Sequence, residues 1–158
     1  AASKAFNVAG LRLAVAVFGS TELRKRFLEL PRHVRGGLSG LGIEAARAAW
    51  THGDPWLEQV RAELERNRAL LTQLVAQSLP GVVHQPPEAT YLAWLDCRAL
   101  ELEPSPYEFF LERARVGLSD GRSFGDPGEG FVRLNFATTR TVLREVVERM
   151  ARALEAPR

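Results

Sequence analysis

Lys4 and Arg12 are the residues near the start of the chain whose types and spacing suggest chemistry on a carbonyl and an anion. A lysine attacks a carbonyl carbon only when its amine is neutral, and partial removal from water favours the neutral form. Small and apolar residues surround Lys4, from Ala1 to Phe6. Arg12 follows eight residues later, and its planar guanidinium suits a phosphate. Spacing alone leaves a second interpretation open, in which Lys4 is a solvated surface charge.

Arg133 is the second residue whose position suggests a specific role. It stands between Val132 and Leu134 in an apolar segment that is typical of a strand. Because side chains alternate along a strand, Arg133 should point to the opposite face from its two neighbours. A half-buried arginine needs an anionic partner. A core carboxylate such as Asp96 or Asp120 is one candidate, although both acids also resemble residues that cap turns.

Other side chains give no sign of a metal site or a disulfide. Cys97 is the only cysteine, so no disulfide can form within the chain and a reducing compartment fits. His33, His52 and His84 are far apart and lack a neighbouring Cys or His. The glycine-rich segment 36–42 lacks the Lys and Ser/Thr that complete a phosphate-binding loop. We therefore predict no metal and interpret 36–42 as a loop.

The composition is that of a globular domain, and the sequence shows neither a membrane span nor a signal segment. The chain has 158 residues, of which 46% are hydrophobic and 25% charged, both ordinary values. No apolar run reaches the roughly 18 residues that suggest a membrane span, and the start does not resemble a signal segment. The first residue is Ala1, and we expect a fragment or a processed product. We expect no membrane contact and a cytoplasmic location.

A basic cluster could be taken for a nucleic-acid site. It falls on a predicted amphipathic helix whose Leu23, Phe27 and Leu30 should face inward, and Phe27 is the only aromatic residue near it. A solvated helix face is therefore the better interpretation, and we predict no nucleic-acid partner. The cluster consists of Arg24, Lys25, Arg26, Arg32 and Arg35.

The first half of the sequence predicts one strand and three helices. The apolar residues 11–18 between glycines predict a buried strand, and Ser20 or Thr21 then caps a helix that should stop near Pro31. A helix is expected over 43–50. Asp54-Pro55 starts a long amphipathic helix that runs to Pro80, with an apolar residue or Asn67 every three or four positions.

The second half predicts a small layered domain. Short strands are expected at 82–84, 91–95, 116–119 and 131–136, and Tyr91 and Trp94 should pack on the sheet. Helices are expected from Ser105-Pro106 through Arg115 and over 139–154, the latter with Val142, Val146, Met150 and Leu154 in step. Arg140 opposes the dipole of that last helix and predicts a specific partner. The fold class is α+β, with helices on a mainly antiparallel sheet.

One motif resembles a known family. Ser3-Lys4 followed by Gly10 and Arg12 is similar to the lysine motif of the fold-type I enzymes that use pyridoxal 5′-phosphate (PLP), the aminotransferase class I and II superfamily. The resemblance implies that Lys4 is catalytic and forms the Schiff base with PLP. It also implies that Arg12 holds the cofactor phosphate and that Ser3 is the hydroxyl residue remaining to assist it. Arg133 would then bind the substrate α-carboxylate.

Three further blocks resemble the cystathionine β-lyase branch called MalY/PatB: 41–68, 88–98 and 117–137. This resemblance implies residues 1–53 as the end of a large cofactor-binding domain and 54–158 as a connecting helix with a small domain. It implies a homodimer and a carbon–sulfur β-lyase acting on sulfur amino acids. An aminotransferase is the alternative, because Lys4, Arg12 and Arg133 serve either reaction. A non-catalytic fragment or pairing module is the other alternative.

Overall fold

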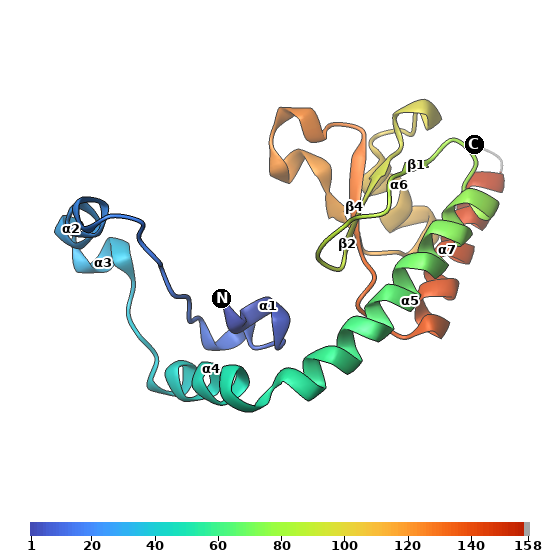
Figure 1. The fold of residues 1–158 in the computed structure, drawn as a ribbon. Coiled ribbons are helices and arrows are strands. Elements are labelled where there is room, and N and C mark those ends of the chain that lie inside the picture. Colours follow the sequence, from blue (N-terminus) through green and yellow to red (C-terminus); the bar gives the residue numbers. More distant parts are fainter. Residues whose placement is uncertain (157–158) are drawn as a thin grey trace. The chain divides into compact units, whose positions relative to one another are not determined.

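The chain folds into two compact units in the computed structural model, which describes residues 1–156. The first unit comprises residues 1–61, and the second begins at residue 62. The boundary falls inside the helix α5 (Asp54–Ser78), which is 25 residues long and confirms the predicted long helix. Figure 1 shows the order of elements along the chain.

The first unit contains short helices and irregular segments. A 3-10 turn (Ala9–Leu11) follows α1, and a single residue, Gly53, separates α4 from α5. The capping of α2 by Ser20, whose hydroxyl accepts a hydrogen bond from the Leu23 amide at 3.1 Å, confirms the predicted helix start. The helices before α5 are α1 (Ala2–Ala5), α2 (Thr21–Glu29), α3 (Arg32–Arg35) and α4 (Gly40–His52).

The predicted buried strand over 11–18 is wrong for this structure. Residues 12–18 form no regular element, and Val15 and Val17 are 57% and 92% exposed. A buried strand needs neighbouring strands to accept and donate its backbone hydrogen bonds. The first unit contains no strand that could pair with this segment.

Two further expectations for the first unit need correction. Leu23, Phe27 and Leu30 are between 38% and 54% exposed, so α2 has no inward face here. The residues predicted to form a loop up to Gly42 are helical from Gly40. The hydroxyl of Ser39 accepts a hydrogen bond from the Gly42 amide at 3.2 Å, and this cap starts α4 early.

The second unit is built on a four-stranded antiparallel sheet with the strand order β1-β2-β4-β3. Three of the predicted strands lie where expected and the antiparallel arrangement is confirmed, whereas the strand predicted over 116–119 starts only at Ser119. The longest pairing joins β2 to β4, with Trp94 opposite Arg133 and Leu95 opposite Val132. The strands are β1 (Val83–His84), β2 (Leu92–Asp96), β3 (Ser119–Asp120) and β4 (Phe131–Asn135).

One face of this sheet carries the core. Ala93, Leu95, Val132 and Leu134 are at most 3% exposed and join the buried residues of the helices in one cluster. Figure 1 shows α7 (Arg140–Glu155) alongside the C-terminal part of α5. The predicted helix from Ser105-Pro106 is present as α6 (Pro106–Phe109) followed by a π-helical turn (Phe110–Ala114).

The apolar face of α7 is set differently from the prediction. The buried residues are Leu143, Val147, Met150 and Ala153, whereas Val142 is 44% exposed. Met150 is buried as predicted, and Val146 and Leu154 are partly buried against the core, so Val142 is the one predicted position that lies outside the apolar stripe. The specific partner predicted for Arg140 is Glu63 on α5, with a nitrogen–oxygen distance of 3.9 Å.

Asn67 ties α5 to the segment between β4 and α7. It is 3% exposed, and its amide nitrogen donates to the carbonyl oxygens of Phe136 at 3.0 Å and Thr138 at 2.7 Å. Both carbonyl groups follow the last strand, and that of Phe136 also accepts a hydrogen bond from the Thr138 amide at 2.9 Å. Among the described residues Asn67 is therefore the donor that satisfies the Thr138 carbonyl, and it is a second donor to the Phe136 carbonyl.

Replacing Asn67 with alanine should lower the free energy of unfolding by about 1–3 kcal/mol, because the Thr138 carbonyl loses its hydrogen-bond donor. Urea unfolding followed by far-ultraviolet circular dichroism measures the change. Gln73→Ala is the matched control, because Gln73 lies on the same helix and is exposed. Equal stabilities of the two variants would contradict this role for Asn67.

Candidate functional site

Lys4 lies on α1 and its side chain is exposed. The predicted shielding by small and apolar neighbours is absent, because Ala2 is buried at 2% exposure while Lys4 faces away from it. Positions two apart on a helix point in nearly opposite directions. Within residues 1–156 the Lys4 amine has no hydrogen bond or ion pair, so no described side chain competes for it.

Arg12 and Ser3 lie at the two ends of a short series of turns. The Val8 amide donates to the Ser3 carbonyl oxygen at 3.1 Å, and the Arg12 amide donates to that of Ala9 at 3.1 Å. Arg12 ends the series in the left-handed region, with φ of +49°. The guanidinium of Arg12 and the hydroxyl of Ser3 make no hydrogen bond within the described residues. No direct interaction joins either side chain to Lys4.

Glycine packing holds this segment against α4. A Cβ at Gly42 would stand 2.6 Å from the carbonyl oxygen of Leu11, and a Cβ at Gly53 would clash with the ring of Phe6. Phe6 also stacks on Trp56, with 6.1 Å between ring centroids. The absence of side chains at these two glycines therefore lets the turns around Lys4 and Arg12 approach α4.

In the second unit, Arg133 lies on the face of the sheet away from the core. Val132 and Leu134 are buried at 0% and 3% exposure, and Arg133 between them is half-buried, as the alternation predicted. Its direct cross-strand neighbours are Trp94 on β2 and Ser119 on β3. These residues form the surface on which the Arg133 side chain rests.

Arg133 makes two contacts through its guanidinium group. The Ser119 hydroxyl oxygen accepts a hydrogen bond from Nη2 of Arg133 at 3.1 Å. The ring of Phe124 lies under the guanidinium carbon, 4.5 Å from centroid to Cζ. Sequence reasoning missed Phe124, because a phenylalanine in the loop before a strand carries no pattern that links it to an arginine on that strand.

Neither carboxylate proposed as a core partner binds Arg133. Asp96 pairs with Arg98 at 2.7 Å and Asp120 pairs with Arg122 at 2.7 Å. The hydrogen bond from the paired arginine lowers the pKa of each carboxyl below its ordinary value, so both acids remain charged and occupied. Each also accepts a backbone hydrogen bond two residues on, which confirms the predicted turn caps. Within the described residues, Arg133 has no carboxylate partner.

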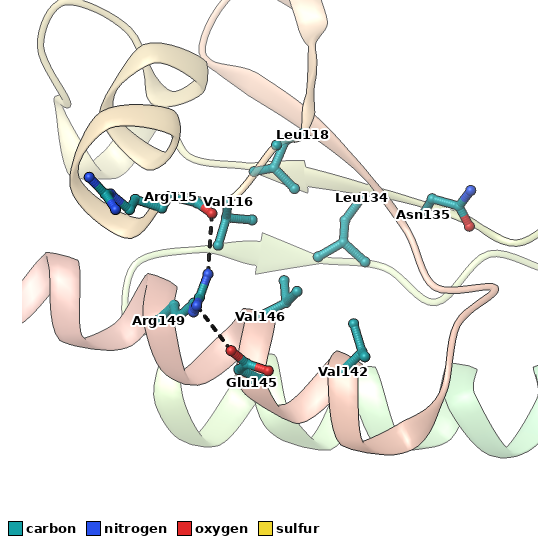
Figure 2. Close-up of a pocket in the computed structure, with 10 residues that line it drawn as sticks. Arg115, Val116, Leu118, Leu134, Asn135, Val142, Glu145, Val146 and Arg149 are labelled. Atoms are coloured by element: carbon teal, nitrogen blue, oxygen red, sulfur yellow. Dashed lines mark hydrogen bonds and ion pairs between the residues drawn. The ribbon is translucent and has the colours of Figure 1, made fainter.

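A pocket of about 240 Å³ lies on the other side of β4 (Figure 2). Leu134 lines it, and Leu134 points to the opposite face from Arg133. Arg149 crosses the pocket and pairs with Glu145 at 3.1 Å. The pocket is therefore separate from the surface that carries Arg133.

Cys97 is unsuited to act as a nucleophile. Its side chain is fully buried at 0% exposure, and burial raises the pKa of its thiol to about 12. Only the thiolate is strongly nucleophilic.

No group of three or more potential metal ligands occurs among residues 1–156, and no helix among them is long and apolar enough to cross a bilayer.

Relatives of the chain share both its sequence and its fold. A Mycobacterium leprae protein provisionally named cystathionine beta-lyase is 42% identical over 97% of this chain and 41% of its own length. Cystathionine beta-lyase PatB of Bacillus subtilis is 33% identical over 98% of this chain and 40% of its own length. The crystal structure of a PLP-bound C–S lyase from Staphylococcus hominis superposes with a TM-score of 0.86 at 31% identity, covering 96% of this chain and 40% of that one.

The chain thus spans about two fifths of the length of the curated relatives it matches. The resemblance to the MalY/PatB branch is confirmed by these relatives, and the α+β fold by the structural match. The family model described as aminotransferase class I and II matches residues 1–150. The chain therefore belongs to the aminotransferase class I and II family.

Proposed function

We propose that the chain is the C-terminal part of a PLP-dependent carbon–sulfur β-lyase of the cystathionine β-lyase type. The observation that carries the proposal is the Arg133 guanidinium, which rests on Ser119 and Phe124 and has no carboxylate partner among the described residues. A guanidinium held in this way can bind an anion from outside the chain, such as a substrate carboxylate. The names of the relatives, two of them cystathionine beta-lyases, indicate an amino-acid substrate.

The side chains of the first unit fit a PLP molecule by their chemistry. Lys4 supplies a primary amine for the aldehyde, and Arg12 and Ser3 supply a guanidinium and a hydroxyl for the phosphate. All three lack side-chain partners within residues 1–156. When bound, PLP stabilises negative charge at the substrate α-carbon. Lys4 moves the α-proton, and Arg133 orients the substrate through its α-carboxylate.

The apolar surface of the first unit supports the proposal that this chain works within a longer parent protein. Large apolar side chains of this unit are exposed to an extent unusual for a monomer surface. In the proposed parent, residues 1–53 end the large cofactor-binding domain, whose remainder covers these side chains, and 54–158 hold the connecting helix and the small domain. The exposed residues are Val15, Val17, Leu23, Phe27, Leu28, Leu30, Val34, Leu38, Leu41, Ile43, Trp50 and Trp56.

Assembly of the parent as a cytoplasmic homodimer stays a prediction that rests on the resemblance.

An aminotransferase is the second candidate function, because the matching family model is named for that reaction. Lys4, Arg12 and Arg133 would bind the cofactor and an amino acid in either case. The two reactions differ in what leaves the substrate and in whether a ketoacid must accept the amino group. A non-catalytic role for the isolated chain is the third candidate.

The full-length parent should release pyruvate from cystathionine without any added ketoacid. The expected carbon–sulfur cleavage needs no amino-group acceptor, whereas transamination does. Pyruvate is measured by a coupled dehydrogenase assay, with and without 2-oxoglutarate. Activity that requires 2-oxoglutarate would assign the parent as an aminotransferase.

The isolated 158-residue chain should bind PLP weakly or not at all, because Lys4 is exposed and its amine is not desolvated. Titration with PLP, followed by dialysis and visible absorbance, measures covalent attachment. Lys4→Ala removes the candidate amine. Lys25→Ala is the control, because Lys25 is the only other lysine of the sequence. A saturable band that survives dialysis and disappears only in Lys4→Ala would contradict the prediction.

Arg133→Lys in the parent should lower kcat/KM by about one and a half to three and a half decades, since a lysine cannot form two parallel hydrogen bonds with a carboxylate. This range corresponds to the roughly 2–5 kcal/mol typical for losing a desolvated charge contact. The melting temperature should change little.

Arg66→Lys is the matched control, because Arg66 is exposed on α5 and, among residues 1–156, pairs with Glu63 alone. It should leave both kcat/KM and the melting temperature unchanged. A large loss of melting temperature in Arg133→Lys, with normal activity per folded molecule, would show that Arg133 has a structural role instead.

A further inference from the structure

We propose that Phe124 is a positioning residue that orients the Arg133 guanidinium for the carboxylate of the amino-acid substrate. The inference rests on the proposed function, in which Arg133 binds that carboxylate. It adds a residue that acts through Arg133, from a loop outside the sheet. Three observations carry it: the contacts of Arg133, the support of Phe124 by other rings, and the rigidity of its loop.

The contacts of Arg133 leave N–H donors of its guanidinium without an acceptor among the described residues, and a ligand can use these donors. A guanidinium is planar and carries five N–H donors in its plane. Its central carbon lies over the Phe124 ring, 4.5 Å from the ring centroid, and the Ser119 hydroxyl accepts from Nη2 at 3.1 Å. A carboxylate can therefore be met in the plane by the remaining donors, as a bidentate pair requires. Without the ring, the flexible side chain would have only the Ser119 hydrogen bond to fix that plane.

Other aromatic rings hold Phe124 in place. Its edge contacts Trp94, with 5.5 Å between centroids and an interplanar angle of 83°. Trp94 in turn stacks on Phe131 at 5.5 Å and 18°, which confirms the predicted packing of Trp94 on the sheet. Both Trp94 and Phe131 share the sheet face of Arg133, since Trp94 is its cross-strand partner and Phe131 precedes it by two positions.

The loop that carries Phe124 is fixed at both ends. Asp120 accepts a hydrogen bond from the Arg122 amide at 3.0 Å and starts the 3-10 turn Gly121–Phe124. Gly121 is buried, and a Cβ there would stand 2.6 Å from the carbonyl oxygen of Phe131. Gly125 ends the turn with φ of +108°, a conformation that favours glycine. The loop is thereby attached to the start of β4 itself.

Core packing does not explain Phe124. Its side chain is 51% exposed and it is absent from the hydrophobic cluster. A half-exposed phenylalanine contributes little to stability by burial, yet its ring is in contact with the one arginine that lacks a carboxylate on this sheet face within the described residues. The arrangement favours a role in recognition over a role in folding.

The test is Phe124→Leu in the full-length parent enzyme, with Phe124→Tyr as the conservative variant. Loss of a cation–π contact typically weakens an interaction by a factor of about 3 to 30. We expect KM for cystathionine to rise by about that factor in Phe124→Leu, with kcat changed less than about twofold. Phe124→Tyr keeps the ring and should keep the KM.

A binding measurement isolates the carboxylate. Glycine and glycinamide differ in that group and neither has a β-substituent to lose, so calorimetric titration of the parent compares them directly. Phe124→Leu should weaken glycine binding by the same factor as KM and leave glycinamide unchanged. Phe124→Met serves as a second ring-free variant should Phe124→Leu fold poorly, and the ratio of the two affinities does not depend on the folded fraction. Equal weakening of both ligands would overturn the proposal.

A double-mutant cycle tests whether Phe124 acts through Arg133. Residues coupled in one interaction have non-additive effects, so Phe124→Leu should have little further effect on KM in an Arg133→Lys background. Additive effects would overturn the inference. A parent that binds no PLP and releases no pyruvate would instead refute the proposed function. If the parent is active and Phe124→Leu changes neither its KM nor its affinity for glycine, this inference is refuted and the proposed function stands.

Discussion

Burial of one face of β4 is the constraint on which the candidate substrate site depends. Val132 and Leu134 are almost completely buried, and burying side chains of this size stabilises a fold by about 1.5–3 kcal/mol each. A shift of register by one residue would expose both and bury Arg133. The same packing therefore holds the core together and directs Arg133 to the open face. The position of the guanidinium is a consequence of the core.

The charges around Arg133 are arranged so that its own charge stays available. Asp96 and Asp120 form local pairs with Arg98 and Arg122, each two residues along the chain. These pairs close turns at the ends of the strands and keep both acids away from Arg133. Ser119 and the Phe124 ring orient the guanidinium without neutralising it. A carboxylate from a ligand would therefore meet little competition.

The sequence predicted the second unit far better than the first. Periods of two and of three to four residues located three of its strands and its helices, because the burial of those side chains is decided within the unit, whereas the strand predicted over 116–119 starts only at Ser119. In α7 the prediction was wrong at Val142, since Val142 and Leu143 are both apolar and only tertiary packing decides which of them is buried. In the first unit, apolarity predicted burial for 11–18 and shielding for Lys4, but pairing and desolvation need partners that these residues do not supply. Phe124 was missed because its contact joins a loop to a strand without any periodic signal.

The two halves of the proposed chemistry therefore differ in how complete they are. The substrate side, around Arg133, is formed by elements that pack on one another within the second unit, and its orienting contacts are present. The cofactor side, around Lys4 and Arg12, has suitable groups on glycine-packed turns but leaves the amine in water. A Schiff-base lysine needs a setting that favours its neutral form, so in the proposed parent the missing desolvation must come from residues beyond the first unit. Recognition of the carboxylate, in contrast, depends on contacts that lie within the chain.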